Sequence, residues 1–530
     1  MGTKNFSNAN DLITFSRASG GTALRKVAYG PELVTNGTFD SDVSGWTDVS
    51  LPSVWNASGY LDYTATAAGQ GSYRAITTVS GRVYKATADL VSSTASGNFR
   101  VGNGSTPDAG LVTAVISSGS SAEILFVAQS ESSYVYLRSG AAGDFSWDNI
   151  SVKEVLFDDA SGDLTLFNHP AGIPRIEYDA DGNVLGLLVE EARTNLSPNS
   201  NFNTGWTSSN SSLETDAAVS PDGAVNAVKL KVTTSSTHHS IYESVAGGTY
   251  AVSVFAKAGE YAGIQITGVQ TTNDHACFNL VDGTAYHTGT NASNAAIEDV
   301  GNGWYRCSAV IPVTIGNLYI AVTDGVSTAW LPTFAGANAT DGIYIYGAQI
   351  EAGDFPTSYI PTSGATATRA ADVASIPVSE FGYNQNQGTV VVEFASKHRP
   401  WSGFIRTFEI GKNGGANQIS LIGTSGTNNT YASIVDNGSS QLTFSDTFFV
   451  QPDTNFYKVC MAMKENDFDM AYNSSLVVGD TSLTIPSIDS TNSLFIGSDR
   501  NGGSVFSGHI KSIKYYPRRL TNAQLQELTT

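Results

Sequence analysis

Apolar and polar residues alternate with a period of two along most of the chain. Clear examples are the segments Tyr134–Arg138, Gly342–Tyr346, Thr389–Phe394 and Gln418–Ile422. The alternating segments are roughly four to eight residues long and are separated by glycine, asparagine, aspartate and serine, which is typical of strands joined by turns. The pattern predicts an all-β protein made of tandem jelly-roll or other β-sandwich domains.

Two turn sequences predict tight hairpins. Asp158–Asp163 would join residues 155–157 to residues 164–167, and Asp179–Asn183 would join the strands on either side of it. Ser-Gly and Asp-Gly in these turns supply the positive φ that such hairpins need.

One short helix is expected, at the end of the sequence. Thr521–Gln524 has the form of a capping box, and Leu525 and Leu528 follow it with the spacing of one helical face. This spacing suits a helix that packs on a sandwich.

An internal repeat divides the chain into tandem domains. Asn36–Phe39 precedes the Gly-Trp-Thr sequence at residues 45–47, and Asn199–Phe202 precedes the same three residues at 205–207. Each copy opens a β-rich stretch of roughly a hundred residues or more, which is too long for the unit of a solenoid.

Composition and charge exclude several classes of function. Only 14% of the residues are charged, and the net charge is −20. The basic surface that nucleic-acid binding needs is therefore absent, and attraction to an anionic membrane is not expected. No apolar run approaches the roughly 18 residues of a membrane span, and the first residues contain no apolar core of a signal peptide. Three scattered cysteines, Cys277, Cys307 and Cys460, indicate buried thiols, although a Cys277–Cys307 bridge is an alternative.

Several motifs resemble those of bacteriophage tail and other virion proteins. They are Ile13–Ser19, Asn168–Arg175 continuing through Leu185–Asn195, and Phe355–Ser375. In the proteins that the chain resembles, the first of these motifs usually comes directly before the second, whereas here residues 20–167 intervene. The two repeated stretches look like carbohydrate-binding modules of the jelly-roll kind. Leu494–Gly497, Phe506–Lys511 and Tyr515–Leu520 resemble a laminin-G or concanavalin-A-like sandwich.

The expected domain organisation follows from the repeat and these resemblances. Residues 1–30 and 155–195 form a small N-terminal β module, a candidate for attachment to the virion, and residues 31–154 are a jelly roll inserted into it. Residues 196–354 are a second jelly roll, residues 355–383 a connector rich in proline, serine and threonine, and residues 384–530 the C-terminal sandwich.

Candidate sugar-binding residues are aromatic side chains in polar surroundings, since a flat ring packs against the C–H groups of a sugar. We select Trp55 and Tyr60 in the first jelly roll, Trp330 in the second, and Trp401 in the loop His398–Gly403 of the C-terminal sandwich. The other tryptophans that stand at domain starts or in alternating strands are assigned to the core; they are Trp46, Trp147, Trp206 and Trp304.

No catalytic motif is found. The Glu-x-Asp-x-x-Glu pattern of concanavalin-A-like glycosidases is absent, and the nearest acids, Glu465, Asp467 and Asp469, are read as a solvated loop. Asp179, Asp181 and Asn183 mimic the start of a calcium loop, with Glu190 at the twelfth place, but the glycine stands at the wrong position and a hairpin turn fits better. The resemblance to jelly-roll modules implies at most a structural Ca²⁺, whose ligands the sequence does not identify.

These observations favour a non-enzymatic virion protein, located on the outer surface of a phage tail or capsid as a tail fibre, spike or decoration. Its partners would be host-surface glycans and other virion proteins, and we expect a homo-oligomer, with a trimer favoured. Two alternatives stay open: a purely structural spacer without glycan binding, and a virion-borne glycan hydrolase.

Overall fold

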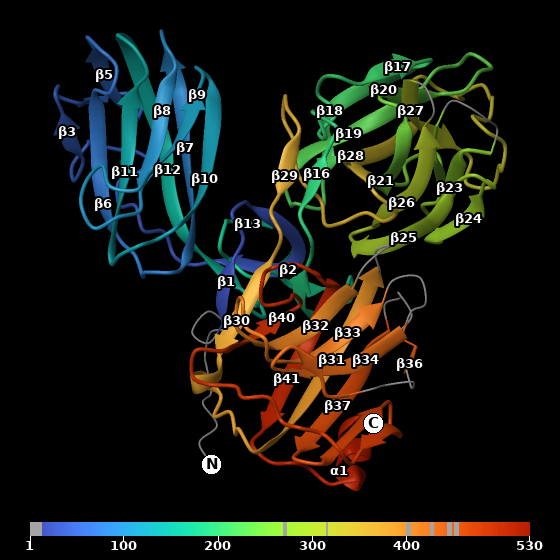
Figure 1. Cartoon of the computed structure of the whole chain (residues 1–530). Coiled ribbons are helices and arrows are strands. Elements are labelled where there is room, and N and C mark those ends of the chain that lie inside the picture. Colours follow the sequence, from blue (N-terminus) through green and yellow to red (C-terminus); the bar gives the residue numbers. More distant parts are fainter. Residues whose placement is uncertain are drawn as a thin grey trace. The chain divides into compact units, whose positions relative to one another are not determined.

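The computed structural model describes residues 13–268, 273–313, 316–398, 404–424, 429–442, 448–449 and 455–530. Strands dominate it and only one short α-helix is present in this part of the chain, so the all-β prediction is confirmed (Figure 1). The chain forms two compact units: one is Lys26–Asp163, and the other combines Met1–Arg25 with Leu164–Thr530. Within the described residues, no helix has the length and apolar character that crossing a membrane requires.

The unit Lys26–Asp163 is a β-sandwich, called here the first sandwich. Its apolar core lies between two sheets and includes Phe99, Leu137, Phe145 and Trp147, all at most 1% exposed. One sheet has the order β3 (Thr47–Val49), β6 (Gly71–Thr77), β11 (Ser132–Ser139), β8 (Gly97–Gly102) and β9 (Leu111–Ile116). The other has the order β10 (Ser120–Val127), β7 (Val83–Ser93), β12 (Gly143–Phe157), β2 (Gly21–Tyr29) and β13 (Asp163–His169), with β5 (Tyr60–Ala65) on β12 and β4 (Val54–Asn56) on β5.

The second sandwich spans residues 196–354 and also has two sheets around an apolar core. The first sheet has the order β17 (Thr207–Ser209), β20 (Ser240–Val245), β27 (Gly316–Thr323), β22 (Gly263–Thr267), β23 (His275–Asn279) and β24 (Thr284–Thr288). The other has the order β18 (Ser211–Val219), β19 (Val225–Val232), β28 (Gly342–Ala352), β21 (Gly248–Lys257), β26 (Trp304–Val313) and β25 (Ser293–Gly301).

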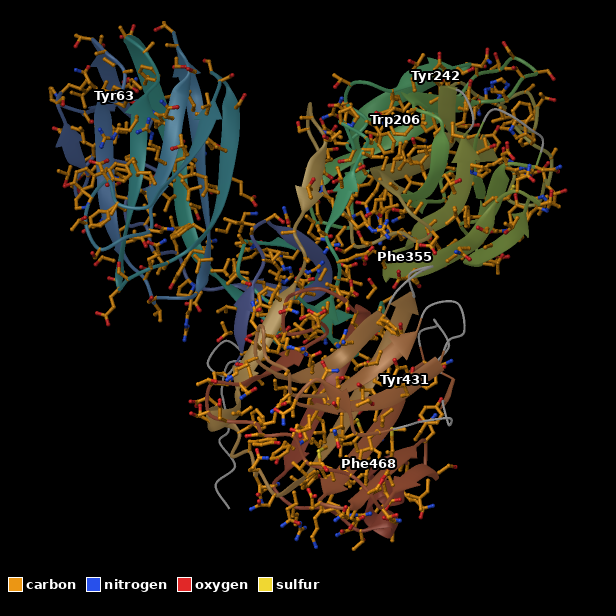
Figure 2. All side chains as sticks on the ribbon, in the orientation of Figure 1. Tyr63, Trp206, Tyr242, Phe355, Tyr431 and Phe468 are labelled. Carbon is orange, nitrogen blue, oxygen red and sulfur yellow. The ribbon has the colours of Figure 1, made fainter. Side chains whose placement is uncertain are left out.

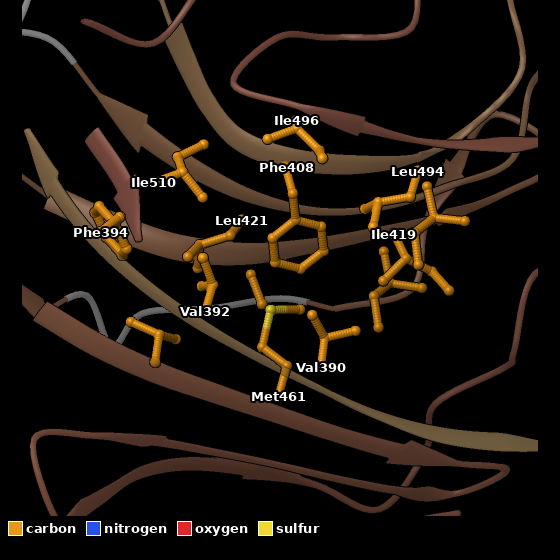
Figure 3. Packing of buried hydrophobic residues seen from close by; sticks show 14 of the residues in the cluster. Val390, Val392, Phe394, Phe408, Ile419, Leu421, Met461, Leu494, Ile496 and Ile510 are labelled. Atoms are coloured by element: carbon orange, nitrogen blue, oxygen red, sulfur yellow. The ribbon is translucent and has the colours of Figure 1, made fainter. Parts of the chain in front are cut away.

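The third sandwich contains the C-terminal residues. Figure 3 shows its core, in which Phe408, Leu421 and Ile496 of one sheet face Val392 and Met461 of the other. One sheet has the order β1 (Thr14–Ser16), β30 (Val373–Pro377), β40 (Ser493–Ile496), β32 (Phe404–Gly411), β33 (Gln418–Thr424), β34 (Asn429–Asp436) and β35 (Ser439–Ser440), with β36 (Phe448–Phe449) on β34. The other has the order β14 (Ile176–Tyr178), β15 (Val184–Val189), β41 (Ser507–Tyr516), β31 (Gln387–His398), β37 (Tyr457–Lys464), β38 (Asp467–Tyr472) and β39 (Ser475–Asp480).

The third sandwich includes strands that the sequence analysis expected elsewhere. Strands β1, β14 and β15 come from the expected N-terminal module, and β30 comes from the expected connector. Leu187 and Val189 of β15 are part of the same apolar core as the C-terminal strands. The structure therefore draws this boundary differently, because these short strands complete the sheets of the third sandwich at their edges. The connector also contributes β29 (Ala367–Arg369), which pairs with β16 (Arg193–Asn195).

The repeated sequence forms the same local structure in both copies. Phe39 and Phe202 are buried with φ values of +47° and +62°, and each ring packs against the following tryptophan, Trp46 or Trp206. The indole N–H of Trp46 donates to the carbonyl of Asn36 at 3.0 Å, and that of Trp206 donates to the carbonyl of residue 199 at 2.9 Å. The repeat is therefore a structural motif that closes the start of each sandwich.

One predicted hairpin is confirmed and the other is wrong. The turn Asp179–Asn183 joins the antiparallel strands β14 and β15. The turn Asp158–Asp163 does not join paired strands, because β2 lies between β12 and β13 in the sheet. A side chain at Gly162 would come within 3 Å of the backbone of Val27, so the turn fits closely over the inserted strand.

The helix α1 (Asn522–Leu528) is confirmed with its capping box. The Thr521 hydroxyl accepts from the backbone N–H of Gln524, and the Gln524 side chain accepts from the backbone of Thr521. Leu525 is fully buried in a small apolar cluster with Cys460 and Ala471 of the third sandwich. All three cysteines are buried free thiols.

Candidate functional site

A pair of tyrosines lies at the same register in the first and second sandwiches. In the first, Thr47 of β3 is opposite Tyr73 of β6, which is opposite Tyr136 of β11. In the second, Thr207 of β17 is opposite Tyr242 of β20, which is opposite Tyr319 of β27. Each threonine directly follows the tryptophan of the repeat. The two tyrosine pairs therefore occupy equivalent positions of duplicated domains.

The two pairs also have the same geometry. The ring centroids are 5.4 Å apart at 38° for Tyr73 and Tyr136, and 5.0 Å apart at 38° for Tyr242 and Tyr319. The strand neighbours of these residues, such as Ile241 and Ile320, point into the apolar cores, so the tyrosines lie on the outer face of each sheet. We call these two outer surfaces the tyrosine faces; Figure 2 labels Tyr242 on the second.

The arginine that packs on the tyrosine face of the first sandwich is already paired, since the Arg138 guanidinium binds Asp108 at 3.3 Å. Tyr134 packs edge-on against Tyr73 at 6.1 Å, and the Arg138 guanidinium lies 4.9 Å from the Tyr136 ring. Tyr136 itself is buried, since its hydroxyl accepts from the backbone N–H of Asp108 in an overlying loop. Tyr73 and Tyr134 are half-buried and remain the accessible rings of this face.

The tyrosine face of the second sandwich has two half-buried rings with polar neighbours. The Ser244 hydroxyl donates to the Asn317 side chain at 2.8 Å. This pair lies two residues along the strands from Tyr242 and Tyr319 and therefore on the same face. The indole N–H of Trp330 donates to the Thr267 hydroxyl at 2.9 Å, and Thr267 is opposite Tyr319 in the sheet. Half-buried rings with hydroxyl and amide groups beside them suit a polyhydroxylated ligand.

The structure places the four predicted sugar-binding residues in different settings. Trp55 is 40% exposed, and its indole N–H donates to the Phe39 carbonyl at 2.7 Å. Tyr60 is half-buried. In the hairpin of β4 and β5, Trp55 is opposite Leu61 and Tyr60 is opposite Asn56. Adjacent pairs point to opposite faces, so Tyr60 lies on the face away from Trp55. Trp55 and Tyr60 therefore do not share one surface. Trp330 borders the second tyrosine face, and Trp401 lies outside the described residues.

The tryptophans assigned to the core are at or near it. Trp147 and Trp304 are at most 1% exposed and Trp206 is 9% exposed, while Trp46 is half-buried against the first core. The half-buried aromatics Tyr73, Tyr242 and Tyr319 are not among the residues predicted from the sequence.

Side chains from the phage-like motifs meet in one buried ion cluster, called here the arginine cluster. The carboxylate of Asp372 binds Arg17 at 3.1 Å and Arg175 at 2.5 Å. The carboxylate of Glu190 binds Arg175 at 2.8 Å and Arg369 at 3.3 Å. The three arginines and Asp372 have no exposed side-chain surface. These five residues come from four segments that are far apart in the sequence, so the cluster fixes the segments to one another.

The connector is bound to the same cluster through Ser358. Its backbone N–H and its hydroxyl each donate to Glu190 at 2.7 Å. Burial alone would raise the pKa of Glu190, but the guanidiniums of Arg369 and Arg175 and the two bonds from Ser358 outweigh burial and hold that pKa well below its ordinary value. Burial and the neighbouring Arg175 lower the pKa of Arg17 to about 10. Glu190 and Arg17 are therefore charged at neutral pH.

This electrostatic arrangement predicts how stability depends on pH. Because the folded-state pKa of Glu190 lies below its ordinary value of 4.5, ionised Glu190 stabilises the fold above pH 4.5, and this contribution is lost as the pH falls. The difference in the free energy of unfolding between the wild type and Glu190→Gln should be largest at pH 7 and should shrink below pH 4.5. Urea titrations at a series of pH values measure this difference, and a constant difference would contradict the assignment.

The acidic residues considered for catalysis or metal binding have other partners. Arg519 binds the carboxylates of both Asp467 and Asp469, so these strand residues form an ion-paired group and not the solvated loop that was expected. Asp179 accepts from Asn183 within its turn, while Glu190 binds the arginine cluster. Among the described residues, no group of three or more histidine, cysteine or acidic side chains is arranged to hold a metal ion.

No protein-family model matches the sequence, and no curated protein matches it. Several solved carbohydrate-binding structures are similar to parts of the chain. The CBM40 module of the Ruminococcus gnavus IT-sialidase, bound to α2,3-sialyllactose, is 15% identical over 28% of this chain and 84% of its own, with a TM-score of 0.24. Domain 4 of the Geobacillus stearothermophilus arabinanase AbnA, in complex with arabinotriose, is 17% identical over 33% and 82%, with a TM-score of 0.26. The tandem CBM22 domains of Paenibacillus barcinonensis Xyn10C are 16% identical over 61% and 98%, with a TM-score of 0.21.

Proposed function

We propose that this protein is a non-enzymatic bacteriophage virion component that adheres to host-surface glycans through its first and second sandwiches. The observation that carries glycan binding is the tyrosine pair at the same register in both sandwiches. A ring held by cross-strand packing offers a flat apolar surface at low cost in conformational entropy, which is what stacking on a sugar ring requires. The adjacent hydroxyl and amide groups would bind the sugar hydroxyls.

Duplication of the face supports adhesion by several weak contacts. Two sites in one chain raise the effective concentration for the second contact, and a homo-oligomer, with a trimer favoured, would multiply this gain. Such binding suits a tail fibre, spike or capsid decoration that meets a cell surface carrying many copies of one glycan.

The virion assignment rests on the motifs that resemble phage proteins. These motifs supply the residues of the arginine cluster, which joins the connector to the strands around it. A rigid junction of this kind suits a protein that transmits force between a particle and a cell. Other virion proteins would then be partners at the surface of the particle.

Binding of the purified protein to bacterial cells, before and after periodate oxidation of their glycans, tests this function. We expect binding to intact cells and its loss after oxidation. Binding that survives oxidation, or no binding across a panel of strains, would favour a structural spacer. Release of reducing sugar from the cell polysaccharide would favour a hydrolase.

A further inference from the structure

The tyrosine face of the first sandwich differs in charge from that of the second. Four of the five strands of its sheet, β6, β8, β9 and β11, contain three arginines and no acidic residue. The acid of the fifth strand, Asp48, follows the outward Thr47 and so points to the other side of the sheet. The strands of the second sheet, β17, β20, β22, β23, β24 and β27, contain no lysine or arginine. The two faces therefore offer different charge to a ligand.

The duplication of the domain identifies the position at which the faces differ. Tyr136 of β11 is opposite Arg100 of β8, whereas its counterpart Tyr319 of β27 is opposite Thr267 of β22. Thr267 is fully buried, and its hydroxyl accepts from the indole N–H of Trp330 at 2.9 Å. A guanidinium on the first face thus stands at the register of a buried, hydrogen-bonded hydroxyl on the second.

The guanidinium of Arg100 is available to a ligand. Arg100 is half-buried, and its Nε is buried without a hydrogen-bond partner among the described residues. Its two terminal nitrogens have no hydrogen-bond or ion-pair partner in that part of the chain either, but unlike Nε they are open to solvent. A partly desolvated guanidinium with both terminal nitrogens free is suited to bind a carboxylate through two parallel hydrogen bonds.

Arg138 adds a second guanidinium to this face. It lies two residues after Tyr136 on β11, and it binds Asp108 of the overlying loop at 3.3 Å. Its pKa is lowered, by burial first and by the charge of Arg100 among the smaller causes. The carboxylate of Asp108 balances one of the two guanidiniums, so a ligand that brings one negative charge would balance the other.

An accessible aromatic ring lies close to Arg100. Tyr134 is half-buried and is opposite Gly102, which is two residues from Arg100 on β8. Diagonal neighbours of this kind are about 7–8 Å apart, a separation that one sugar residue with a carboxylate at its edge can span. The exposed Thr113 is opposite Arg100 on β9 and adds a hydroxyl on the other side.

We infer that the tyrosine face of the first sandwich binds a sugar that carries a carboxylate, which pairs with Arg100 while the sugar ring stacks on Tyr134. The second face, which lacks this arginine, takes neutral sugars. The inference rests on the proposed glycan binding and adds the class of sugar that each face selects. Uronic acids and sialic acids share the carboxylate, and the experiment distinguishes them.

Saturation-transfer NMR titrations on the full chain test this inference with matched pairs of sugars. The pairs are the methyl glycosides of glucuronic acid and glucose, those of galacturonic acid and galactose, and sialyllactose with lactose. We expect at least one acidic sugar to bind more tightly than its neutral partner. Arg100→Thr, which gives the first face the residue of the second, should weaken binding of that acidic sugar by roughly tenfold or more and leave the neutral partner unchanged.

Two further variants separate the role of Arg100 from that of overall charge. Arg82→Thr removes the same charge from a partly exposed ion pair with Glu154 in the same unit, and should leave both affinities unchanged. Asp108→Asn removes the carboxylate beside Arg138 and should strengthen binding of the acidic sugar. Asparagine tolerates the φ of +63° that Asp108 adopts, so this variant should keep the loop. Circular dichroism checks that each variant is folded.

Equal binding of both members of every pair would overturn the inference while leaving glycan binding in place. A folded Arg100→Thr protein with the wild-type affinity for the acidic sugar would do the same, as would binding of neutral sugars alone. If no probe binds, the inference fails, and the proposed function fails with it only where adhesion to cells is absent as well.

Discussion

Replacing Asp372 by asparagine is expected to destabilise the unit that combines Met1–Arg25 with Leu164–Thr530 by about 3–5 kcal/mol, the usual cost of leaving buried charges without their partner. Asp372 binds Arg17 and Arg175, and its carboxylate also accepts from the backbone N–H of Glu190 at 3.0 Å. In the variant, Arg17 would lose its carboxylate partner Asp372, and Arg175 and Arg369 would keep that of Glu190. Because the amide of asparagine fills the same space as the carboxylate, the loss of stability would come from the missing charge and not from a packing defect.

Hydrogen–deuterium exchange at increasing urea concentrations measures this effect separately in each unit. Peptides from residues 185–195 and 355–377 should lose protection at lower urea in Asp372→Asn, whereas peptides within residues 60–140 should not change. The matched control is Glu154→Gln, which removes a carboxylate from a partly exposed ion pair with Arg82 and should cost about 1 kcal/mol or less. Equal effects of the two substitutions would show that the arginine cluster does not determine stability.

The sequence predicts the class of fold because alternation reports burial directly. Segments such as Thr389–Phe394 and Gln418–Ile422 are strands with alternate side chains in the core of the third sandwich. Alternation does not report which strand pairs with which. Strand β2 separates β12 from β13, and β1 joins the C-terminal sheet, because tertiary packing and not local turn chemistry selects these neighbours.

The same limit explains what was missed at the candidate site. Tyr73 and Tyr242 occur in ordinary alternating strands, and their partners Tyr136 and Tyr319 are distant in the sequence. The repeat of Gly-Trp-Thr was visible, but loops of different length separate it from the two tyrosine pairs, so only the strand register aligns them. Trp55 and Tyr60 are aromatic residues in polar surroundings, but residue type does not report which face of a strand a side chain occupies, and the register of β4 and β5 places these two on opposite faces.

The arginine cluster gives the phage-like motifs a physical meaning that the sequence alone lacks. Each motif contributes one or two residues to the arginine cluster. The ion pairs of the cluster join different strands or loops, except that between Arg369 and Asp372, which lie 3.8 Å apart and close in sequence. Charged residues in such a motif could equally face a ligand. Because they are buried and pair with one another, they hold the segments of this unit together, so the proposed glycan contacts must be sought on the sandwich surfaces.

Replacing both Tyr73 and Tyr242 by alanine is expected to abolish adhesion to glycan-bearing cells. Truncating an aromatic residue that carries a contact typically costs about 2 kcal/mol, or roughly thirtyfold in affinity. Each single variant also removes one of two linked sites, and linkage of this kind is worth about 10²–10⁴ in avidity. We therefore expect each single variant to lose more adhesion than one weakened contact explains, and the double variant to lose all measurable adhesion.

The control for this experiment is the double variant Tyr73→Phe/Tyr242→Phe. Phenylalanine keeps the ring that packs on the sugar and against Tyr136 or Tyr319, so adhesion should stay close to that of the wild type. Surface plasmon resonance on immobilised cell polysaccharide measures affinity and dissociation, and circular dichroism confirms that the sheets are intact. Adhesion by a folded alanine double variant at the wild-type level would exclude the tyrosine faces as the glycan site. Loss in both double variants would indicate that the hydroxyls, and not the ring faces, make the contact, because only the hydroxyls distinguish phenylalanine from tyrosine.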